Sequence, residues 1–367
     1  MALDVAFLGY RFMGKAHANA LTRLPMFFPN APATNREVLV GRDESELDAA
    51  ADRLGFDRTS TDWETVIEDV DVLYNLGPNA LHPDPSIAAL EAGTHVVCEK
   101  PLAATLEGAE RMARAARDSA ATAGVAFNYR YVPAIQYAKN LIDDGVLGDV
   151  RHVRGRYLQD WLVDPEAEWS WRNDAEIAGS GALGDLGAHT VDLIQFLVAD
   201  VDRISGRLRT FVDERPVPDG DDTRPVTVDD AYSAQAELAN GAMATLEATR
   251  MATGRKNDHT IAIEGTEGSL RFSLERLNEL EVHREGQRGF ETVLVTDPDD
   301  PYVDHWWPPG HVIGWEHTFV HENAAFLSAV VDDTDYAPSF EDGLSVQRVL
   351  DAIQRSDVTD QWVRVAE

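Results

Sequence analysis

The 367-residue sequence contains one cysteine, four lysines and no run of 18 or more apolar residues. The single cysteine, Cys98, rules out an intrachain disulfide and a cysteine-rich metal site. The lack of a long apolar run excludes a membrane-spanning helix, because about 20 apolar residues are needed to cross a bilayer. The first residues have the pattern of a strand and lack the basic and apolar regions of a secretory signal. We therefore expect a cytoplasmic protein.

Positive charge is also scarce, since 32 basic and 64 acidic residues give a formal net charge of −32. Nucleic acids and anionic membranes are poor candidate partners, because both require local positive potential. An acidic, lysine-poor surface is typical of proteins that stay hydrated in concentrated salt. We expect a halophilic protein, with an ordinary acidic surface as the alternative.

The length predicts about two domains. Over residues 1–130, short β-branched runs alternate with helical patterns, which is typical of a doubly wound α/β domain with a parallel sheet. Residues 131–367 show alternating strands, and Asn240-Gly241 between two of them indicates a hairpin. This part is predicted to be an α+β domain with a large, mainly antiparallel open sheet.

The pattern predicts the following elements. The strands are 5–8, 37–40, 72–75, 95–98, 125–127, 150–159, 204–210, 232–238, 242–249, 260–264 and 269–272. The helices are 13–24, 44–54, 83–92, 105–123, 183–198, 319–331 and 342–356. Two long loops, 211–229 and 297–315, are rich in Pro, Asp and Gly, and loops of that length are uncommon unless they are functional or mobile.

A glycine motif, Gly9-Tyr-Arg-Phe-Met-Gly14, follows the first predicted strand and begins the first helix. This is where the pyrophosphate of a dinucleotide binds a helix N-terminus. Arg11 occupies the position at which the fingerprint has a second glycine, so it either clamps phosphate charge or crowds the cofactor. A simple strand-to-helix turn is the alternative reading of the motif.

The second predicted strand ends at Gly41-Arg42-Asp43. An acidic residue at this point binds the ribose 2′-hydroxyl of NAD, whereas an arginine accommodates the 2′-phosphate of NADP. Arg42 favours NADP over NAD, and Asp43, one residue later, leaves NAD open.

The fourth predicted strand ends in the sequence Val96-Val-Cys-Glu-Lys-Pro101. Ligands of open parallel sheets bind beyond the carboxyl ends of the strands, so Lys100 is expected at the cleft. A chain with so few lysines has one here, which suits a role for a compact ammonium group; an ordinary surface lysine is the alternative.

A glycine-rich segment leads into the predicted helix 183–198. Asp185, His189 and Asp192 are spaced i, i+4 and i+7, which places them on one face of an α-helix. A carboxylate one turn away orients an imidazole for proton transfer. A structural histidine is an equally open interpretation.

Four stretches resemble the Gfo/Idh/MocA family, the group of glucose-fructose oxidoreductase and inositol dehydrogenase. They are GYRFMGKAHANA, LGPNALHPDPSIAALEAGTHVVCEKPLA, FNYRYVPA and WRNDAEIAGSGALGDLGAHTVDL. The similarity runs nearly end to end, and the pairing of EKP with a downstream GDxGxH is specific. PMFFPNAP, YLQDW and HWWP resemble the branch that includes levoglucosan dehydrogenase.

The resemblance implies a Rossmann NAD(P)-binding domain at 1–130 and a substrate-binding and oligomerisation domain at 131–367. It matches the family's catalytic triad to Lys100, Asp185 and His189. The residues that it matches to the cofactor site, together with Arg11 of the glycine motif, are Gly9, Phe12, Met13, Arg42, Pro78, Asn79, His82, Glu99, Asn128, Trp171 and Arg172.

These residue types suit hydride transfer between a nicotinamide and a hydroxyl carbon. His189 is expected to act as general base, oriented by Asp185, while Lys100 stabilises the developing alkoxide. Such a reaction requires no metal, so none is expected at the cluster of His305, His311 and neighbouring aspartates.

The substrate is inferred from aromatic residues. The second domain contains six tryptophans, which favour apolar stacking on a sugar ring. Packing in the core or at an interface explains at least half of them. We expect a cyclic sugar, anhydrosugar or polyol substrate and a homo-oligomer. Three alternatives stay open: a glycoside-cleaving enzyme that forms a keto-sugar, an oxidoreductase with a permanently bound cofactor, and a non-catalytic regulator. The expected substrate residues are Arg130, Tyr157, Gln159, Asp160 and Trp161.

Overall fold

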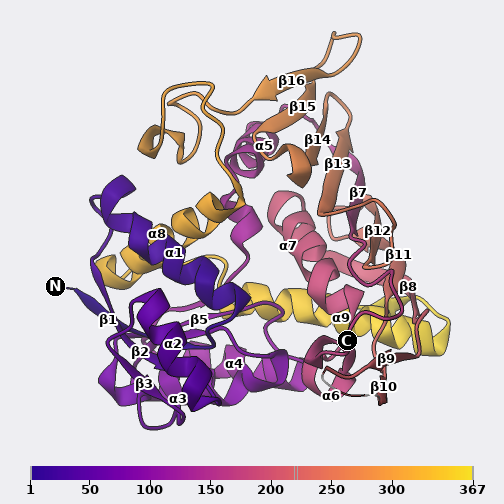
Figure 1. The fold of residues 1–367 in the computed structure, drawn as a ribbon. Coiled ribbons are helices and arrows are strands. Elements are labelled where there is room, and N and C mark those ends of the chain that lie inside the picture. Colours follow the sequence, from indigo (N-terminus) through magenta and orange to yellow (C-terminus); the bar gives the residue numbers. More distant parts are fainter. Residues whose placement is uncertain (1, 219, 221, 366–367) are drawn as a thin grey trace. The chain divides into compact units, whose positions relative to one another are not determined.

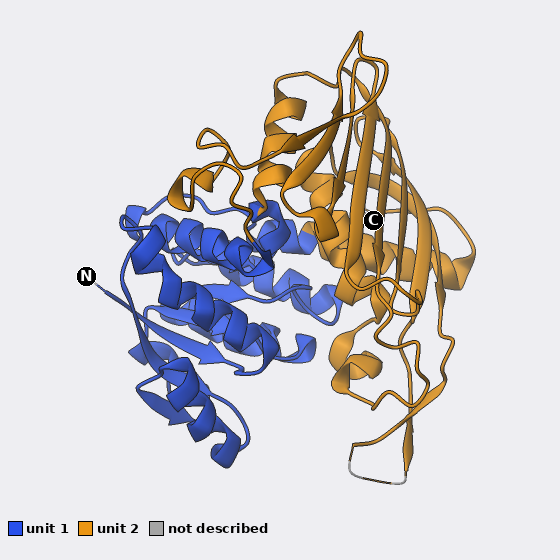
Figure 2. Cartoon of the chain, turned by 45° about the horizontal axis from the view of Figure 1, so that its top comes forward, with its two compact units in different colours: residues 1–131, 314–344 blue, residues 132–313, 345–367 orange. Residues whose placement is uncertain are grey.

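A computed structural model describes residues 2–218, 220 and 222–365. The chain forms two compact units (Figure 2). The first unit contains residues 1–131 and 314–344, and the second contains residues 132–313 and 345–367. Among the described residues, no helix has the length and apolar character that a membrane span requires.

The first unit is built on a six-stranded parallel sheet with the order β3-β2-β1-β4-β5-β6. Because β2 and β4 flank β1, the strand order reverses between β1 and β4, as in a Rossmann fold. The expected doubly wound domain is confirmed. The strands are β1 (Leu3–Leu8), β2 (Thr34–Val40), β3 (Arg58–Ser60), β4 (Val72–Asn75), β5 (His95–Cys98) and β6 (Ala123–Val125).

Helices cover both faces of this sheet. Figure 1 shows α1 and α8, which pack together, on the face opposite to α3 and α4. Their ends follow local signals: Asp43 caps α2, which ends at the left-handed Gly55, and α3 begins with proline and ends at the left-handed Gly93. The helices are α1 (Phe12–Phe27), α2 (Glu44–Leu54), α3 (Pro83–Ala92), α4 (Leu106–Asp118) and α8 (Trp315–Asp332).

The second unit contains a nine-stranded sheet with the order β16-β15-β14-β13-β7-β12-β11-β8-β17. Among the described residues of this sheet, only the β7–β12 pair is parallel, so the expected, mainly antiparallel sheet is confirmed. The hairpin predicted at Asn240-Gly241 joins β11 to β12. The strands are β7 (Val150–Leu158), β8 (Val201–Arg209), β11 (Ala231–Leu238), β12 (Met243–Thr249), β13 (Asp258–Gly265), β14 (Ser269–Ser273), β15 (Glu279–His283), β16 (Glu291–Leu294) and β17 (Val363–Arg364).

The helices of the second unit are α5 (Pro133–Asp143), α6 (Ala175–Ala178), α7 (Ala188–Leu197) and the greater part of α9 (Phe340–Thr359). Helices α5 and α7 contact the sheet through β14, β15 and β7. In α9, Ser356 accepts a hydrogen bond from Gly206 of β8. Alternate residues of β11 and β12 are buried and exposed, so one sheet face forms the core and the other stays open.

Several elements differ from the sequence prediction. The predicted helix 105–123 ends at Asp118, and the strand expected at 125–127 lies at 123–125. The loop expected at 211–229 contains a hairpin of β9 (Glu214–Pro216) and β10 (Thr223–Pro225), whereas the loop expected at 297–315 contains the 3₁₀ turn Val303–His305 and ends where α8 begins at Trp315. Other 3₁₀ turns are Ile67–Asp69, Asn79–Leu81, Asn128–Tyr131, Trp171–Asn173 and Leu274–Arg276.

Residues 314–344 belong to the first unit, although the sequence prediction assigns them to the second domain. The reason is that α8 packs against α1, and its apolar residues Phe319, Val320, Phe326 and Leu327 are buried.

Candidate functional site

The glycine motif lies where β1 ends and α1 begins. Gly9 has a φ of +114°, a region that side chains disfavour, and a Cβ there would lie 2.8 Å from the carbonyl oxygen of Leu76. Its N–H donates to the carbonyl of Val40. The chain therefore passes close to the ends of β2 and β4, and only glycine fits this cradle.

Arg11 stands at the N-terminal end of α1 and is exposed. Its guanidinium forms a 3.0 Å ion pair with Glu46 of α2, and the hydroxyl of Tyr10 donates to the same carboxylate. The side chain of Arg11, which replaces the second glycine of the fingerprint, is thus held by an ion pair with α2.

Arg42 and Asp43 follow β2. Asp43 accepts hydrogen bonds from the backbone N–H groups of Glu46 and Ser45 and from the Ser45 hydroxyl. The hydrogen bond from the Glu46 amide is the main cause of the lowered pKa of Asp43. Arg42 is exposed and makes none of the hydrogen bonds or ion pairs formed among the described residues.

Two buried side chains, Asn75 and His82, contact the backbone of the loop that follows β4. Nδ2 of Asn75 donates to the carbonyl of His82 and to the Ser86 hydroxyl. The ring nitrogens of His82 lie 3.1 Å and 3.0 Å from the carbonyl oxygens of Gly77 and Pro101, and burial lowers its pKa. The neutral ring has one N–H and donates to one of these two carbonyls, and it lies between the loop that contains Pro78 and Asn79 and the loop that contains Lys100.

Lys100 follows Glu99 at the end of β5 and is partly exposed. Glu99 is 5% exposed, and its Oε2 accepts a hydrogen bond from the backbone N–H of Lys100 at 3.2 Å. The buried carboxylate fixes the start of the loop that carries Lys100.

Further expected residues lie at other strand and helix ends of the first unit. Asn128 is buried and donates to the hydroxyl of Thr318, and the buried Arg130 forms an ion pair at 3.1 Å with the partly exposed Asp342. Burial raises the pKa of Asp342, but the Arg130 charge and the hydrogen bonds from Ser339 and Arg130 together outweigh it, so the pKa is lowered. Phe12 is 62% exposed and stacks on Trp315, while Met13 beside it is partly buried.

In the second unit, Asp185 lies on a π-helical turn, Leu183–Gly187, that precedes α7. The N–H of Ala188 donates to the carbonyl of Leu183, five residues earlier, so the regular α-helical spacing expected for Asp185 and His189 is widened at its start. His189 is 7% exposed, and Asp192 is buried.

Asp229 anchors the beginning of this turn. Its carboxylate accepts the N–H groups of Gly181 at 2.7 Å and Leu183 at 2.8 Å, and its backbone carbonyl accepts from Arg250. Burial raises the pKa of Asp229 against the opposing effect of these partners. A Cβ on Gly181 would lie 1.8 Å from the Asp229 carbonyl oxygen, so the approach requires glycine.

Tyr157 lies beside His189, with ring centroids 6.1 Å apart. His259 stacks on Tyr157 with ring centroids 4.5 Å apart and lies 3.1 Å from the hydroxyl of Thr190. Burial lowers the pKa of His259 to about 3, so this imidazole is neutral at neutral pH.

Three of the four expected substrate residues of the second unit, Tyr157, Gln159 and Trp161, belong to one hydrogen-bonded group, and Asp160 has a separate partner. Tyr157 and Gln159 both donate to Oδ1 of Asn257 at 2.7 Å, and Trp161 donates to Gln159 at 2.9 Å. Asp160 pairs with Lys256 at 2.7 Å, which lowers the pKa of Asp160.

Lys256, Asn257 and His259 were absent from the sequence prediction. The scarcity of lysine was a usable signal for Lys256, whereas no motif pointed to Asn257 or His259. Trp171 and Arg172 lie on a 3₁₀ turn, where the guanidinium of Arg172 stacks 4.5 Å from the Trp171 ring. In the part of the chain that the structure describes, no three His, Cys, Asp or Glu residues are grouped as metal ligands.

The residues present fit a dinucleotide in the first unit. Gly9 leaves a cradle that a Cβ would fill, and the N-terminal end of α1 begins three residues later. Both features permit a phosphate to approach backbone N–H groups.

Comparisons with known proteins agree with this arrangement. A family described as an oxidoreductase family with an NAD-binding Rossmann fold matches residues 3–127, and the GFO/IDH/MocA C-terminal domain matches residues 135–271. Levoglucosan dehydrogenase from Pseudarthrobacter phenanthrenivorans is 41% identical over 100% of this chain and 98% of its own. D-xylose 1-dehydrogenase [NADP(+)] from Haloarcula marismortui is 33% identical over about half of each chain.

Solved structures are similar over the full length. An oxidoreductase domain protein from Kribbella flavida has a TM-score of 0.96 and 48% identity, covering 100% of both chains. Levoglucosan dehydrogenase in complex with NADH and levoglucosan has a TM-score of 0.96 and 41% identity, also with complete coverage. The chain is thus a member of the Gfo/Idh/MocA family of nicotinamide-dependent oxidoreductases.

Proposed function

We propose that the protein is a dehydrogenase that oxidises a CH–OH group of an anhydrosugar or a closely related cyclic sugar. The observation that carries this proposal is the full-length similarity to levoglucosan dehydrogenase. The hydrogen-bonded group of Tyr157, Gln159 and Asn257 beside His189 supports it, because amide and hydroxyl groups recognise sugar hydroxyls.

The catalytic roles follow from the chemistry of the side chains. The imidazole of His189 removes the proton of the substrate hydroxyl, and the carboxylate of Asp185 orients the ring. The ammonium of Lys100 stabilises the negative charge that develops on the substrate oxygen. The nicotinamide supplies the hydride acceptor when it is bound.

Three single variants test these roles: Lys100→Ala, Asp185→Asn and His189→Ala. Loss of general-base catalysis by His189 is expected to lower kcat by about 10²- to 10⁴-fold. Reduced-cofactor binding, measured by fluorescence titration, should change little in all three. Unchanged turnover of levoglucosan and related sugars in any variant contradicts the role of that residue.

We further propose that Arg42 selects NADP. The guanidinium has no partner among the described residues, whereas the carboxylate of Asp43 already caps α2. Arg42→Ala should lower the ratio of kcat/KM for NADP to that for NAD, because the 2′-phosphate loses its counter-charge. Arg53→Ala removes another exposed arginine, on α2, and is the matched control. Equal ratios in the wild type and Arg42→Ala contradict the proposal.

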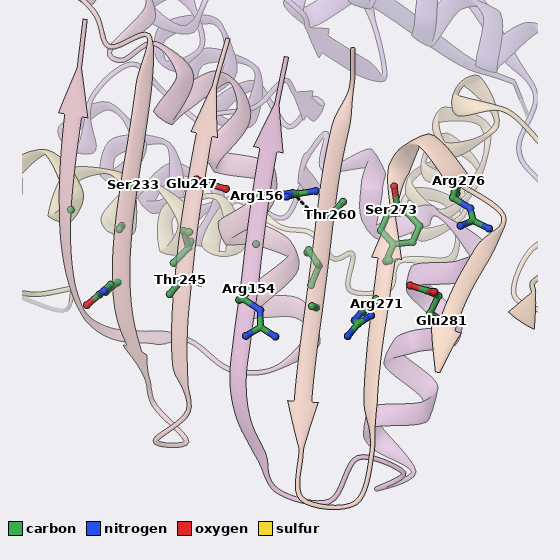
Figure 3. A pocket seen from close by; sticks show the side chains of 18 of the residues that line it. Arg154, Arg156, Ser233, Thr245, Glu247, Thr260, Arg271, Ser273, Arg276 and Glu281 are labelled. Carbon is green, nitrogen blue, oxygen red and sulfur yellow. Dashed lines mark hydrogen bonds between the residues drawn. The ribbon is translucent and has the colours of Figure 1, made fainter. Parts of the chain in front are cut away.

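The open face of the nine-stranded sheet supports a homo-oligomer. A hollow of about 800 Å³ lies on it, and five arginines but only three glutamates line that hollow (Figure 3). The whole chain has twice as many acidic as basic residues. Arg154, Arg156, Arg207 and Arg276 pair with carboxylates of the same chain, whereas Arg271 stacks on Phe290 and forms none of the ion pairs among the described residues. Arg271 therefore offers a positive charge to a second copy of this acidic chain. The residues are Arg154, Arg156, Arg207, Arg271, Arg276, Glu247, Glu279 and Glu281.

Light scattering coupled to size-exclusion chromatography tests this interface. Arg271→Glu should shift the molar mass toward the monomer, whereas Arg53→Glu, on α2 of the first unit, should not. A wild-type protein that elutes as a monomer would refute the interface.

A further inference from the structure

His17 of α1 is completely buried, and the roles proposed above do not use it. Three aromatic rings enclose it, with centroids at 6.4 Å for Phe7, 5.4 Å for Tyr74 and 5.2 Å for Phe319. Both ring nitrogens nevertheless face polar atoms. Nε2 lies 3.4 Å from Oε1 of Glu99, and Nδ1 lies 3.1 Å from Nδ2 of Asn323 in α8.

The hydrogen bonds of Asn323 determine which ring nitrogen carries the proton. Nδ2 of Asn323 is 2.7 Å from the carbonyl oxygen of Phe319, which only accepts, and Oδ1 accepts from the hydroxyl of Tyr74 at 2.7 Å. The amide has two hydrogens, so one serves the Phe319 carbonyl and the other points to Nδ1 of His17. Nδ1 therefore accepts, and the neutral ring carries its proton on Nε2.

The Nε2–H group consequently donates to Glu99. Oε1 of Glu99 accepts from His17, and Oε2 accepts from the backbone N–H of Lys100. The hydrogen bonds therefore run in one direction, from α8 through α1 to the residue before Lys100. Both oxygens of the Glu99 carboxylate therefore accept hydrogen bonds, which restricts the conformation of the loop that begins at Lys100.

We propose that His17 is a positioning residue, which acts through Glu99 to hold Lys100 where it stabilises the developing alkoxide. This inference rests on the proposed catalytic role of Lys100. A packing role alone requires an aromatic ring at this position, but it does not require that both ring nitrogens form hydrogen bonds.

Two substitutions separate packing from positioning. His17→Phe keeps the aromatic ring and removes both polar contacts, whereas His17→Gln places an amide donor near the position of Nε2. The kcat of His17→Phe should fall about 10- to 100-fold, since small misplacements of a catalytic group are costly. The KM for the sugar and the affinity for the reduced cofactor should change much less. His17→Gln should recover most of the lost turnover.

The matched control is His95→Gln. His95 is half-buried at the start of β5, and its Nδ1 accepts a hydrogen bond from the backbone N–H of Thr122. This variant should lower the thermal midpoint without lowering kcat. If His17→Phe behaves like His95→Gln, with a changed midpoint and unchanged kcat, the positioning role is wrong.

Nitrogen-15 NMR of the histidine rings tests the hydrogen-bond chain independently of turnover. The wild-type spectrum should show the Nε2–H tautomer for His17, assigned by comparison with His17→Gln. In Asn323→Asp, two acceptor oxygens face His17 and Tyr74, so a proton should appear on Nδ1 and kcat should fall. An Nδ1–H tautomer in the wild type overturns the inference. If Lys100→Ala leaves kcat unchanged while the wild type shows the Nε2–H tautomer, the catalytic role of Lys100 is wrong. The hydrogen bonds from Asn323 through His17 to Glu99 are then correct, but they do not position a catalytic group.

Discussion

His259 makes the stability of the protein depend on pH in the acidic range. Burial lowers its pKa to about 3 in the folded protein, whereas an unfolded histidine has a pKa of about 6.5. Below pH 6.5 the unfolded chain therefore binds a proton that the folded protein does not bind. The contribution of the neutral His259 to the free energy of unfolding is therefore fully present above pH 6.5, and it is lost as the pH falls toward 3. Each unit of pKa shift corresponds to about 1.4 kcal/mol, so the free energy of unfolding should fall by about 2–3 kcal/mol between pH 7.5 and 4.5.

The assay is urea unfolding, followed by tryptophan fluorescence at constant KCl concentration, for the wild type and His259→Phe. Phenylalanine preserves the stacking on Tyr157 but cannot titrate. Its loss of the contact with Thr190 changes stability by an amount that does not vary with pH. The wild type should lose about 2–3 kcal/mol more than the variant between pH 7.5 and 4.5. Parallel curves for the two proteins would refute a neutral, buried His259.

Three other predictions concern stability and binding. Asp229→Ala leaves the N–H groups of Gly181 and Leu183 without an acceptor, so urea unfolding should show a loss of about 2–6 kcal/mol; a loss below about 1 kcal/mol speaks against this anchor. Gly9→Ala forces a side chain into a left-handed φ, at a cost of about 1–2 kcal/mol, and should weaken binding of the reduced cofactor in a fluorescence titration. Unchanged affinity would show that the cradle is dispensable. If the acidic surface is a halophilic adaptation, the thermal midpoint should rise with KCl concentration up to several molar, since the Debye length is roughly 3 Å at 1 M; a midpoint independent of salt contradicts this expectation.

Elements with strong local signals were predicted closely from the sequence. β4, β5, α2 and α3 begin and end at the predicted residues, because buried β-branched runs or specific capping residues define them. Weaker local patterns were missed. The strands β3, β9, β10 and β15–β17 are short, and their pairing depends on neighbours distant in the sequence.

The candidate site shows the same division. Gly9, Arg42 and Lys100 follow strands that the sequence predicted, so their place at the carboxyl edge of the sheet could be inferred. The π-helical turn at Asp185 could not, because residue spacing alone suggests a regular α-helix and the wider turn depends on tertiary packing around Gly181. Asn257 was missed for a related reason: its contacts with Tyr157 and Gln159 bridge about 100 residues of sequence.

The return of residues 314–344 to the first unit has a consequence for synthesis on the ribosome. The chain passes between the units at 131–132, 313–314 and 344–345, so neither unit is a continuous segment. A nascent chain that ends at Tyr131 lacks α8, and with it Asn323, the partner of both His17 and Tyr74. The cofactor-binding unit is synthesised first but is completed only after about nine-tenths of the chain has emerged. The first unit therefore cannot be completed before most of the second unit has been synthesised, which restricts folding of the units in the order of synthesis.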